Sequence, residues 1–339
     1  MRFLIRVSIT CALLASSAST WSNDYAGPLF GLAPTPNGNV LVADSGSGVV
    51  QVNTGINGFP AIPGITDIAP IGNSSLWVTR SGPEGLSDEG QALLRVSRGQ
   101  VSVIANLWEF ELMYNPQPDD VRSNPFDVNS LGGEAALVAD AAGNDLLKIN
   151  KRGQVEAVAI FPTRLASLVS LKAALGCPGS GIAPVCFLGD FIPAQAVSTS
   201  IAVGPDGYYY VGELRGFPGP LNQSRIWRVA PWASWADCEV SEDCEVVFDG
   251  GFTSIIDLVF GPDGLLYVVE FDENGWFAAE VLGIPAGGTI NACDLANLHC
   301  DEVATGISFP TAVTFDKSGQ LWTTENAIFP DIASVTAVP

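Results

Sequence analysis

Carboxylates recur at matched places along this 339-residue sequence. Six segments each hold two short apolar runs around a turn, and they align on that turn. The residue that starts the first run is aspartate in three segments, at Asp67, Asp127 and Asp257. The start of the first run and the end of the second lie at the same end of a hairpin, so side chains there share one face. The residues that end the second runs are Asp44, Arg80, Asp140, Glu213, Glu270 and Glu325.

These acidic positions have two interpretations. The acids that end the second runs are expected to cap backbone N–H groups where neighbouring repeats begin. The alternative is that carboxylates hold a hard cation. Like charges gathered near one axis repel unless a proton or a cation neutralises them. Oxygen ligands without histidine or cysteine suit Ca²⁺ best, so Asp67, Asp127 and Asp257 are the predicted calcium ligands.

Several other chemistries lack the residues they need. The chain has one histidine, His299, which makes a Ser-His-Asp triad or a multi-histidine metal centre improbable. No Gly-Lys-Ser/Thr loop that could cradle a phosphate is present. Carboxylates are therefore the main reactive groups.

The elements that carry the carboxylates are hairpins. In the clearest copy, Ser200–Val203 and Tyr208–Val211 flank the turn Gly204–Gly207. Pro205 presets the backbone angle for the first turn position, and Gly207 can take the positive φ that other residues resist. Third and fourth apolar runs follow most hairpins, which predicts four strands in each repeat.

The spacing of the repeats predicts an all-β, six-bladed β-propeller. The aligned ends at residues 44, 80, 140, 213, 270 and 325 lie 36, 60, 73, 57 and 55 residues apart. Four strands in about 40 to 55 residues, repeated six times, is typical of propeller blades. A two-sheet sandwich, the rival fold, does not predict six copies of one hairpin. The inner-strand residues expected to be buried are Ile201, Val203, Leu258, Phe260, Val313 and Phe315.

Two parts of the chain depart from this regular pattern. Residues 162–196 form the largest insertion, and amphipathic character in Arg164–Leu175 predicts a short helix there. The last repeat has only Ile332–Val338 after its hairpin. This predicts a ring closure that is short of a strand, or a chain that stops early.

The first 20 residues are typical of a secretory signal peptide. Arg2 and Arg6 precede the apolar segment Val7–Leu14, and small residues follow. Cleavage after Ala18 or after Thr20 fits equally well. Residues 21–339 are expected to form one secreted or periplasmic propeller domain, with no later apolar run long enough to span a membrane.

The net charge of −21 narrows the class of partner. Only 15 basic residues stand against 36 acidic ones. Nucleic acids and anionic membrane surfaces attract Lys/Arg patches, so neither is an expected partner. A monomer with an acidic, solvated surface is the simplest interpretation.

The cysteines support export. Cys11 lies in the signal segment, and the remaining six fall into three close pairs. Six cysteines allow 15 connectivities. Short loops close at the least entropic cost, which favours pairing between nearest neighbours. The predicted bridges are Cys177–Cys186, Cys238–Cys244 and Cys293–Cys300.

Parts of the sequence resemble the scytonemin-biosynthesis D/E-type propeller family, relatives of NHL-repeat proteins. The matching segments are Asn124–Asp127, Leu137–Lys148, Ala202–Pro218 and Gly251–Tyr267. The run Gly212–Pro218 is the most specific, because strand formation does not dictate its residue order. The resemblance implies a secreted or periplasmic six-bladed propeller with a role in making an extracellular indole-phenol pigment.

Three functions stay open at this point. The first is a binding or accessory protein whose loop face, around Glu213, Arg215 and Phe217, holds a small aromatic molecule or a partner protein. The second is a Ca²⁺-dependent lactonase or similar hydrolase of the six-bladed class. Those enzymes usually offer an axial Asn, which the aligned positions lack. The third is a protein–protein module of the cell envelope.

Overall fold

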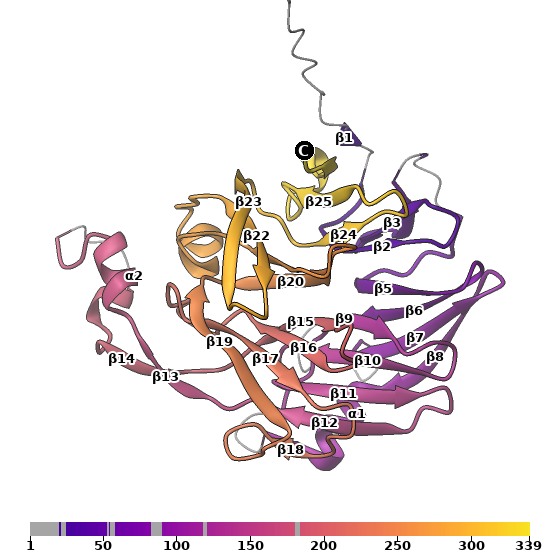
Figure 1. Cartoon of the computed structure of the whole chain (residues 1–339), viewed down its shortest axis with the longest axis horizontal. Helices are drawn as coiled ribbons and strands as arrows, with labels where there is room; N and C mark the ends of the chain where they lie inside the picture. The colour runs from indigo at the N-terminus through magenta and orange to yellow at the C-terminus, as the bar shows by residue number, and fades with distance from the viewer. Residues whose placement is uncertain are drawn as a thin grey trace, which may run out of the picture.

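Six small sheets surround a common centre, as the sequence predicts (Figure 1). The computed structural model describes residues 20–21, 25–52, 54, 58–82, 90–117, 121–179 and 184–339. The predicted signal peptide lies almost wholly outside the described residues. The innermost strands of successive blades contact one another around the ring: β2, β5, β9, β15, β20 and β24.

The first three blades follow the chain in order. Blade one has three described strands: β2 (Leu29–Pro34), β3 (Val40–Asp44) and β4 (Gly48–Gln51). Blade two consists of β5 (Ile65–Ile71), β6 (Ser75–Arg80), β7 (Ala92–Ser97) and β8 (Gln100–Asn106), followed by helix α1 (Leu107–Tyr114). Blade three consists of β9 (Pro125–Ser130), β10 (Ala135–Asp140), β11 (Asp145–Asn150) and β12 (Val155–Ile160), with β18 (Ala236–Asp237) pairing parallel to β12.

The remaining blades complete the ring. Blade four consists of β15 (Ser198–Val203), β16 (Tyr209–Glu213), β17 (Ser224–Val229) and β19 (Cys244–Phe252). Blade five consists of β20 (Ile255–Phe260), β21 (Leu266–Glu270), β22 (Gly288–Asp294) and β23 (His299–Ile307). Blade six consists of β24 (Val313–Phe315), β25 (Leu321–Glu325), β26 (Ser334–Ala337) and β1 (Thr20–Trp21).

The hydrophobic core is divided among the blade interfaces. Six clusters of buried apolar side chains each join residues from two adjacent blades. The cluster between blades three and four, for example, contains Leu146, Phe161 and Trp227, all almost fully buried. Burial of both faces therefore holds each blade in the ring. Apolar residues along the strands supply the side chains that are buried on these faces.

The hairpin turns use an aspartate in a recurring way. Gly207 has the predicted positive φ, at +80°. Asp206 accepts a hydrogen bond from the Tyr208 N–H and another from the Tyr210 hydroxyl. Asp263 makes the equivalent bonds to Leu265 and Tyr267, and Asp316 accepts from Trp322. These turns are therefore fixed by the carboxylate as well as by the glycine.

The predicted burial of the inner strands is correct at one end of each strand only. Ile201, Leu258 and Val313 are buried. Val203, Phe260 and Phe315 are half-buried, because they lie where their strands reach the turn face. The rings of Phe260 and Phe315 pack edge to face on Tyr210 and Tyr267 of the preceding blade.

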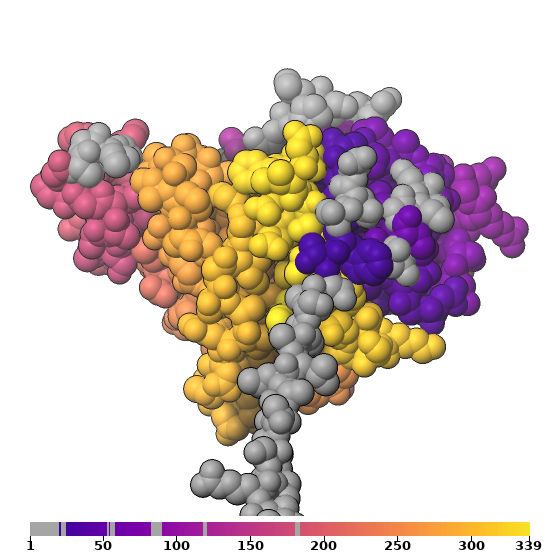
Figure 2. Space-filling model, turned by 90° about the horizontal axis from the view of Figure 1, so that it is seen from above, coloured from indigo at the N-terminus to yellow at the C-terminus, as the bar shows by residue number. Residues whose placement is uncertain are grey.

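The ring closes with a strand from the other end of the chain. β26 follows β25 in blade six, and β1 adds antiparallel to β26, with Thr20 opposite Thr336. The C-terminal part of the chain accordingly lies against the N-terminal part (Figure 2). The prediction of a closure short of a strand was wrong for blade six, because the fourth strand comes from upstream of the first repeat.

The 162–196 insertion projects from the ring beside blades four and five (Figure 1). It contains a two-stranded sheet, β13 (Arg164–Ser167) with β14 (Phe191–Ala194). Helix α2 covers only Val169–Ala174, so the predicted helix was too long at its N-terminal end. Residues 164–167 pair with β14 instead.

The three predicted disulfides are all present. Cys177–Cys186 closes the tip of the insertion, and Cys293–Cys300 joins directly opposite residues of β22 and β23. Cys238–Cys244 joins the connection after β18 to the start of β19. Such bridges are consistent with an oxidising compartment. In the part of the chain that the structure describes, no helix has the length and hydrophobicity needed to cross a membrane.

Candidate functional site

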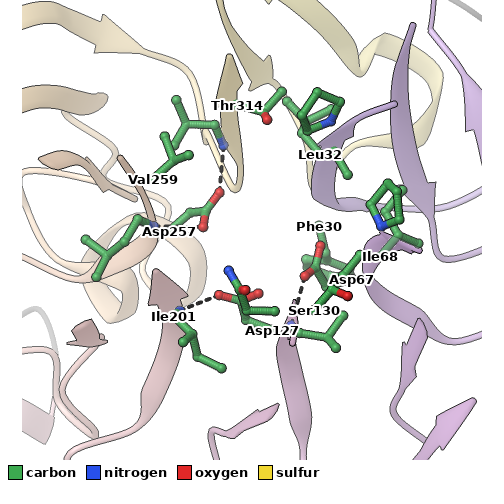
Figure 3. A pocket seen from close by; sticks show the side chains of 18 of the residues that line it. Phe30, Leu32, Asp67, Ile68, Asp127, Ser130, Ile201, Asp257, Val259 and Thr314 are labelled. Carbon is green, nitrogen blue, oxygen red and sulfur yellow. Dashed lines mark hydrogen bonds between the residues drawn. The ribbon is translucent and has the colours of Figure 1, made fainter. Parts of the chain in front are cut away.

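A pocket of about 620 Å³ occupies the central channel (Figure 3). Its walls come from the innermost strands of the blades and from residues at two turns, including Pro36 and Lys317. Aromatic, aliphatic and proline side chains dominate the lining, and four carboxyl groups interrupt it, those of Asp67, Asp127, Asp257 and Asp316. This size and composition are typical of sites for small molecules.

The three predicted aspartates reach this pocket from three different blades (Figure 3). Each is the third residue of an innermost strand, β5, β9 or β20. The alignment of the repeats predicted this equivalence, and the structure brings the three residues to one channel.

Each aspartate also binds the next blade. Asp67 accepts a hydrogen bond from the Val128 N–H at 2.9 Å, and Asp127 accepts one from the Ile201 N–H at 2.5 Å. Asp257 accepts one from Val313 at 2.7 Å. In each bond the aspartate belongs to one blade, and the N–H group belongs to the next blade in chain order. The aspartates thus connect neighbouring blades, a role that the sequence interpretation gave to the acids at the strand ends.

Burial favours the protonated form of the three channel aspartates. It raises the pKa of Asp67 well above its usual value, and the neighbouring charge of Asp127 raises it further. Burial also raises the pKa of Asp127, and that of Asp257 well above its usual value. Asp67 and Asp127 are close enough for their charges to interact, and a proton on one of the two carboxyl groups relieves the repulsion between them.

These contacts leave a poor fit for calcium. One oxygen of each aspartate faces a backbone N–H of the next blade, and Asp257 Oδ1 accepts from Leu258 N–H. Among the residues that the structure describes, no group of three acidic, histidine or cysteine side chains is placed to hold a metal ion. Calcium binding by Asp67, Asp127 and Asp257 therefore stays a prediction.

In the innermost strands, the residues that directly precede the aspartate position narrow the channel at the end where these strands start. Blades one and three contribute Phe30 and Phe126, whose rings pack edge to face 5.7 Å apart. Phe126 also joins the apolar cluster that contains Ile256 of blade five, so its ring extends across the channel. The pocket consequently extends from the aspartates toward the turn face, where Pro36 and Lys317 line it.

Threonines alternate with these apolar residues. Blades two, four and six carry Thr66, Thr199 and Thr311, all buried. Each hydroxyl donates to the carbonyl of the first innermost-strand residue in the next blade, at 2.6 to 2.8 Å. Sequence reasoning missed this set. The signal was available, because a threonine precedes the aligned position in repeats two, four and six.

The acids that end the second strands fix their own blades. Asp44, Asp140 and Glu270 accept backbone N–H bonds from Ala26, Asn124 and Thr253, which lie just before the first strand of the same blade. Glu325 accepts only from the Thr336 hydroxyl in the described contacts. The prediction of backbone caps is correct for three of these acids, but each serves its own blade rather than the neighbouring one.

Of the three residues predicted to bind a ligand, only Phe217 offers surface. Glu213 is fully buried and accepts a 2.6 Å hydrogen bond from Trp227 Nε1, and Arg215 is 2% exposed. Burial raises the pKa of Glu213 to about 7, against the opposing influence of Arg215 and Trp227. Phe217 is 45% exposed, and its ring packs edge to face on Phe277. Glu213 and Arg215 therefore form an interior ion pair behind this surface.

Comparison with known proteins shows the fold. No protein-family model matches the chain, and no curated protein matches its sequence. A gluconolactonase from Xanthomonas campestris superposes with a TM-score of 0.59 at 14% identity, over 98% of this chain and 94% of that one. A virginiamycin B lyase from Staphylococcus aureus superposes with a TM-score of 0.54 at 15% identity, over 94% and 87%.

A Bacteroides thetaiotaomicron protein of unknown function is similar to the same degree. Its TM-score is 0.56 at 10% identity, over 96% of this chain and 72% of that one. Identities this low establish the architecture and leave the chemistry open. The resemblance to the scytonemin family likewise remains an expectation.

Proposed function

We propose that this protein is an exported binding propeller that holds a small aromatic molecule in its central channel. The observation that carries the proposal is the 620 Å³ pocket, with apolar walls around the carboxyl groups of Asp67, Asp127 and Asp257. Aromatic and proline walls favour a flat apolar ligand. Carboxyl groups accept hydrogen bonds, so hydroxyl, indole N–H or amine groups suit them, whereas the net charge of −21 disfavours anions.

This ligand class agrees with the one expected from the resemblance to the scytonemin family. Three disulfides and the signal-like N-terminal sequence support an extracellular or periplasmic location. An indole-phenol would combine the flat ring and the hydrogen-bond donors that the pocket suits.

Calorimetric titration with 5-hydroxyindole tests the proposal. We expect saturable binding of one molecule per chain and at least tenfold weaker binding of indole-3-acetate, whose carboxylate faces the acidic channel. Asn129 lines the pocket and is half-buried, so Asn129→Trp should fill the channel and abolish binding without unfolding the protein. Equal binding of both compounds, or undiminished binding by the folded variant, would overturn the proposal.

A hydrolase is the second candidate, and one observation favours it. Asp67 and Asp127 lie side by side in the channel (Figure 3), and burial raises the pKa of both. A protonated and an ionised carboxyl group together can supply general acid and general base catalysis. Gluconolactone hydrolysis, assayed with and without EDTA, tests this candidate and the predicted calcium dependence together. Activity that Asp127→Asn does not reduce would exclude this pair of aspartates as its source.

A further inference from the structure

A second group of buried carboxylates lies between helix α1 and blade three, away from the central channel. Glu111 is on α1, and Asp145 is the first residue of β11. Both side chains have no exposed surface. Neither belongs to the six aligned strand starts or strand ends, so the repeat pattern gives them no role.

The oxygens of these two carboxyl groups have no partners. In the described part of the chain, nothing donates a hydrogen bond to either oxygen of Glu111 or of Asp145. The neighbouring Asp140 is different, because it accepts from Asn124, Gly143 and the Ser123 hydroxyl. A buried acceptor left unpaired costs ~1–3 kcal/mol, and more when it is charged. Four such oxygens in one place require a compensating group.

The Glu111 carboxyl group is directed at the loop that joins Asp140 to Asp145. A Cβ atom on Gly143 would lie 3.3 Å from Glu111 Oε1 and 3.2 Å from Asp140 Cγ, which places Glu111 beside the turn that leads into β11. Burial and the charges of Glu111 and Asp140 raise the pKa of Asp145 well above its usual value. Burial and the charge of Asp140 raise the pKa of Glu111 to about 8.

Two residues that adjoin the ends of the same helix also have side chains with unpartnered polar atoms. Asn115 caps the C-terminus of α1, one turn after Glu111, and its Oδ1 has no partner among the described residues. Gln91 binds the start of α1 through its backbone carbonyl, which accepts from Leu107 N–H. Its buried side-chain amide is also unpartnered in the described structure. Residues four apart on a helix share one face, so Leu107, Glu111 and Asn115 lie on the same side.

We propose that Glu111 and Asp145 form a calcium site that attaches helix α1 to blade three. Two carboxylates balance the charge of one divalent ion, and amide oxygens, backbone carbonyls and water are the usual further ligands of Ca²⁺. Histidine and cysteine contribute nothing here, which disfavours zinc. Asp140 has its oxygens occupied, and this agrees with the absence of a three-acid metal group from the described residues.

Calcium at this site would order an exposed apolar surface as well as stabilise the fold. The outward side of α1 exposes Leu112, Met113 and Tyr114, and the Tyr114 ring packs near Trp235. Without the ion, the buried oxygens of Glu111 and Asp145 would be left unpaired, and this cost would loosen the helix that carries these side chains. With the ion bound, the apolar surface would be held in place.

Thermal unfolding of the chelator-treated full chain, with and without Ca²⁺, tests the site. We expect Ca²⁺ to raise the melting temperature on the order of 5 °C at 100-fold excess over its dissociation constant. Glu111→Gln and Asp145→Asn should each lose most of that rise. Asp257→Asn, in the channel, and Glu239→Gln, on the exposed acidic surface, should keep it. Absence of a rise in the wild type, or its loss only in Asp257→Asn, would overturn the proposal.

Terbium luminescence gives a second measurement on the unaltered protein. Tyr114 and Trp235 lie beside α1, whereas the channel lining contains neither tyrosine nor tryptophan. Tb³⁺ bound at Glu111 and Asp145 should therefore emit on excitation of these rings, and Ca²⁺ should displace it. Lack of sensitised emission would contradict the site even if the variants failed to fold.

Discussion

At the scale of single residues, aspartate and glutamate have different structural roles at different positions of the repeat. Asp206 and Asp263 fix hairpin turns, Asp67 and Asp127 bind the next blade, and Glu270 holds the segment before its own blade. Backbone N–H groups compensate several of these buried acids. The acidic composition is therefore partly structural.

Glu270 leads to a prediction about pH. Burial raises its pKa from 4.5 to about 7, although Thr253 N–H and Asn291 donate to it. Between pH 4.5 and 7 the folded state keeps a proton that the unfolded state has lost, so stability falls as pH rises. The loss should reach ~3 kcal/mol from this residue and level off above pH 7. Urea unfolding at pH 5 and at pH 8 measures it.

The matched variants for this prediction are Glu270→Gln and Glu134→Gln. The glutamine at position 270 can still accept from Thr253 but cannot ionise, so its stability should depend less on pH. Glu134 is exposed, and its replacement should leave the pH dependence unchanged. An undiminished pH dependence in Glu270→Gln would show that other buried acids cause it.

At the scale of elements, the disulfides divide into those within blades and one in the insertion. Cys293–Cys300 joins β22 to β23 inside blade five, and Cys293 is fully buried. Cys177–Cys186 lies in the insertion, next to a small apolar cluster around Leu171 and Val185. Loss of the first affects a sheet of the ring, whereas loss of the second affects a local subregion.

Removal of each bridge should therefore have a different effect. Replacing Cys293 and Cys300 by alanine should lower the free energy of unfolding by ~2–3 kcal/mol, because the closed loop is short. Replacing Cys177 and Cys186 should leave the main unfolding transition nearly unchanged and make residues 164–194 sensitive to protease. Denaturant titration and limited proteolysis distinguish the two variants. Equal destabilisation by both would mean that the insertion unfolds together with the ring.

At the scale of the whole molecule, closure joins the two ends of the chain. Val335 on β26 is fully buried in the cluster between blades six and one, with Leu29 and Tyr25. The Thr311 hydroxyl adds a bond to the Leu29 carbonyl. A ring without free blade faces depends on this interface, since an open ring would expose two apolar sheets.

Weakening the closure should destabilise the entire ring. Val335→Ala creates a cavity at the interface, and we expect a loss of about 2 kcal/mol in the free energy of unfolding with a single cooperative transition. Val240→Ala is the control, because Val240 is 79% exposed and its replacement should change little. If Val335→Ala produced a separate early transition, blade six would be shown to unfold independently.

The sequence by itself determined the architecture, because hairpin turns, strand alternation and repeat spacing are local. Pro205 and Gly207 predict a turn whatever packs around it. Cysteines that are close in sequence pair because short loops close at little entropic cost. The shared position of Asp67, Asp127 and Asp257 followed from the same alignment. These features need only neighbours in the chain, so they could be predicted without coordinates.

The tertiary structure decided what each carboxylate binds. The partner of Asp127 is a backbone N–H 74 residues away, and the strand that completes blade six comes from the opposite end of the chain. Burial of Glu213 and Arg215, which removes them from the surface, depends on blade packing and on the insertion. Glu111 reaches the loop that precedes Asp145 only because α1 folds against blade three. Such encounters are set by long-range packing, which no local pattern encodes.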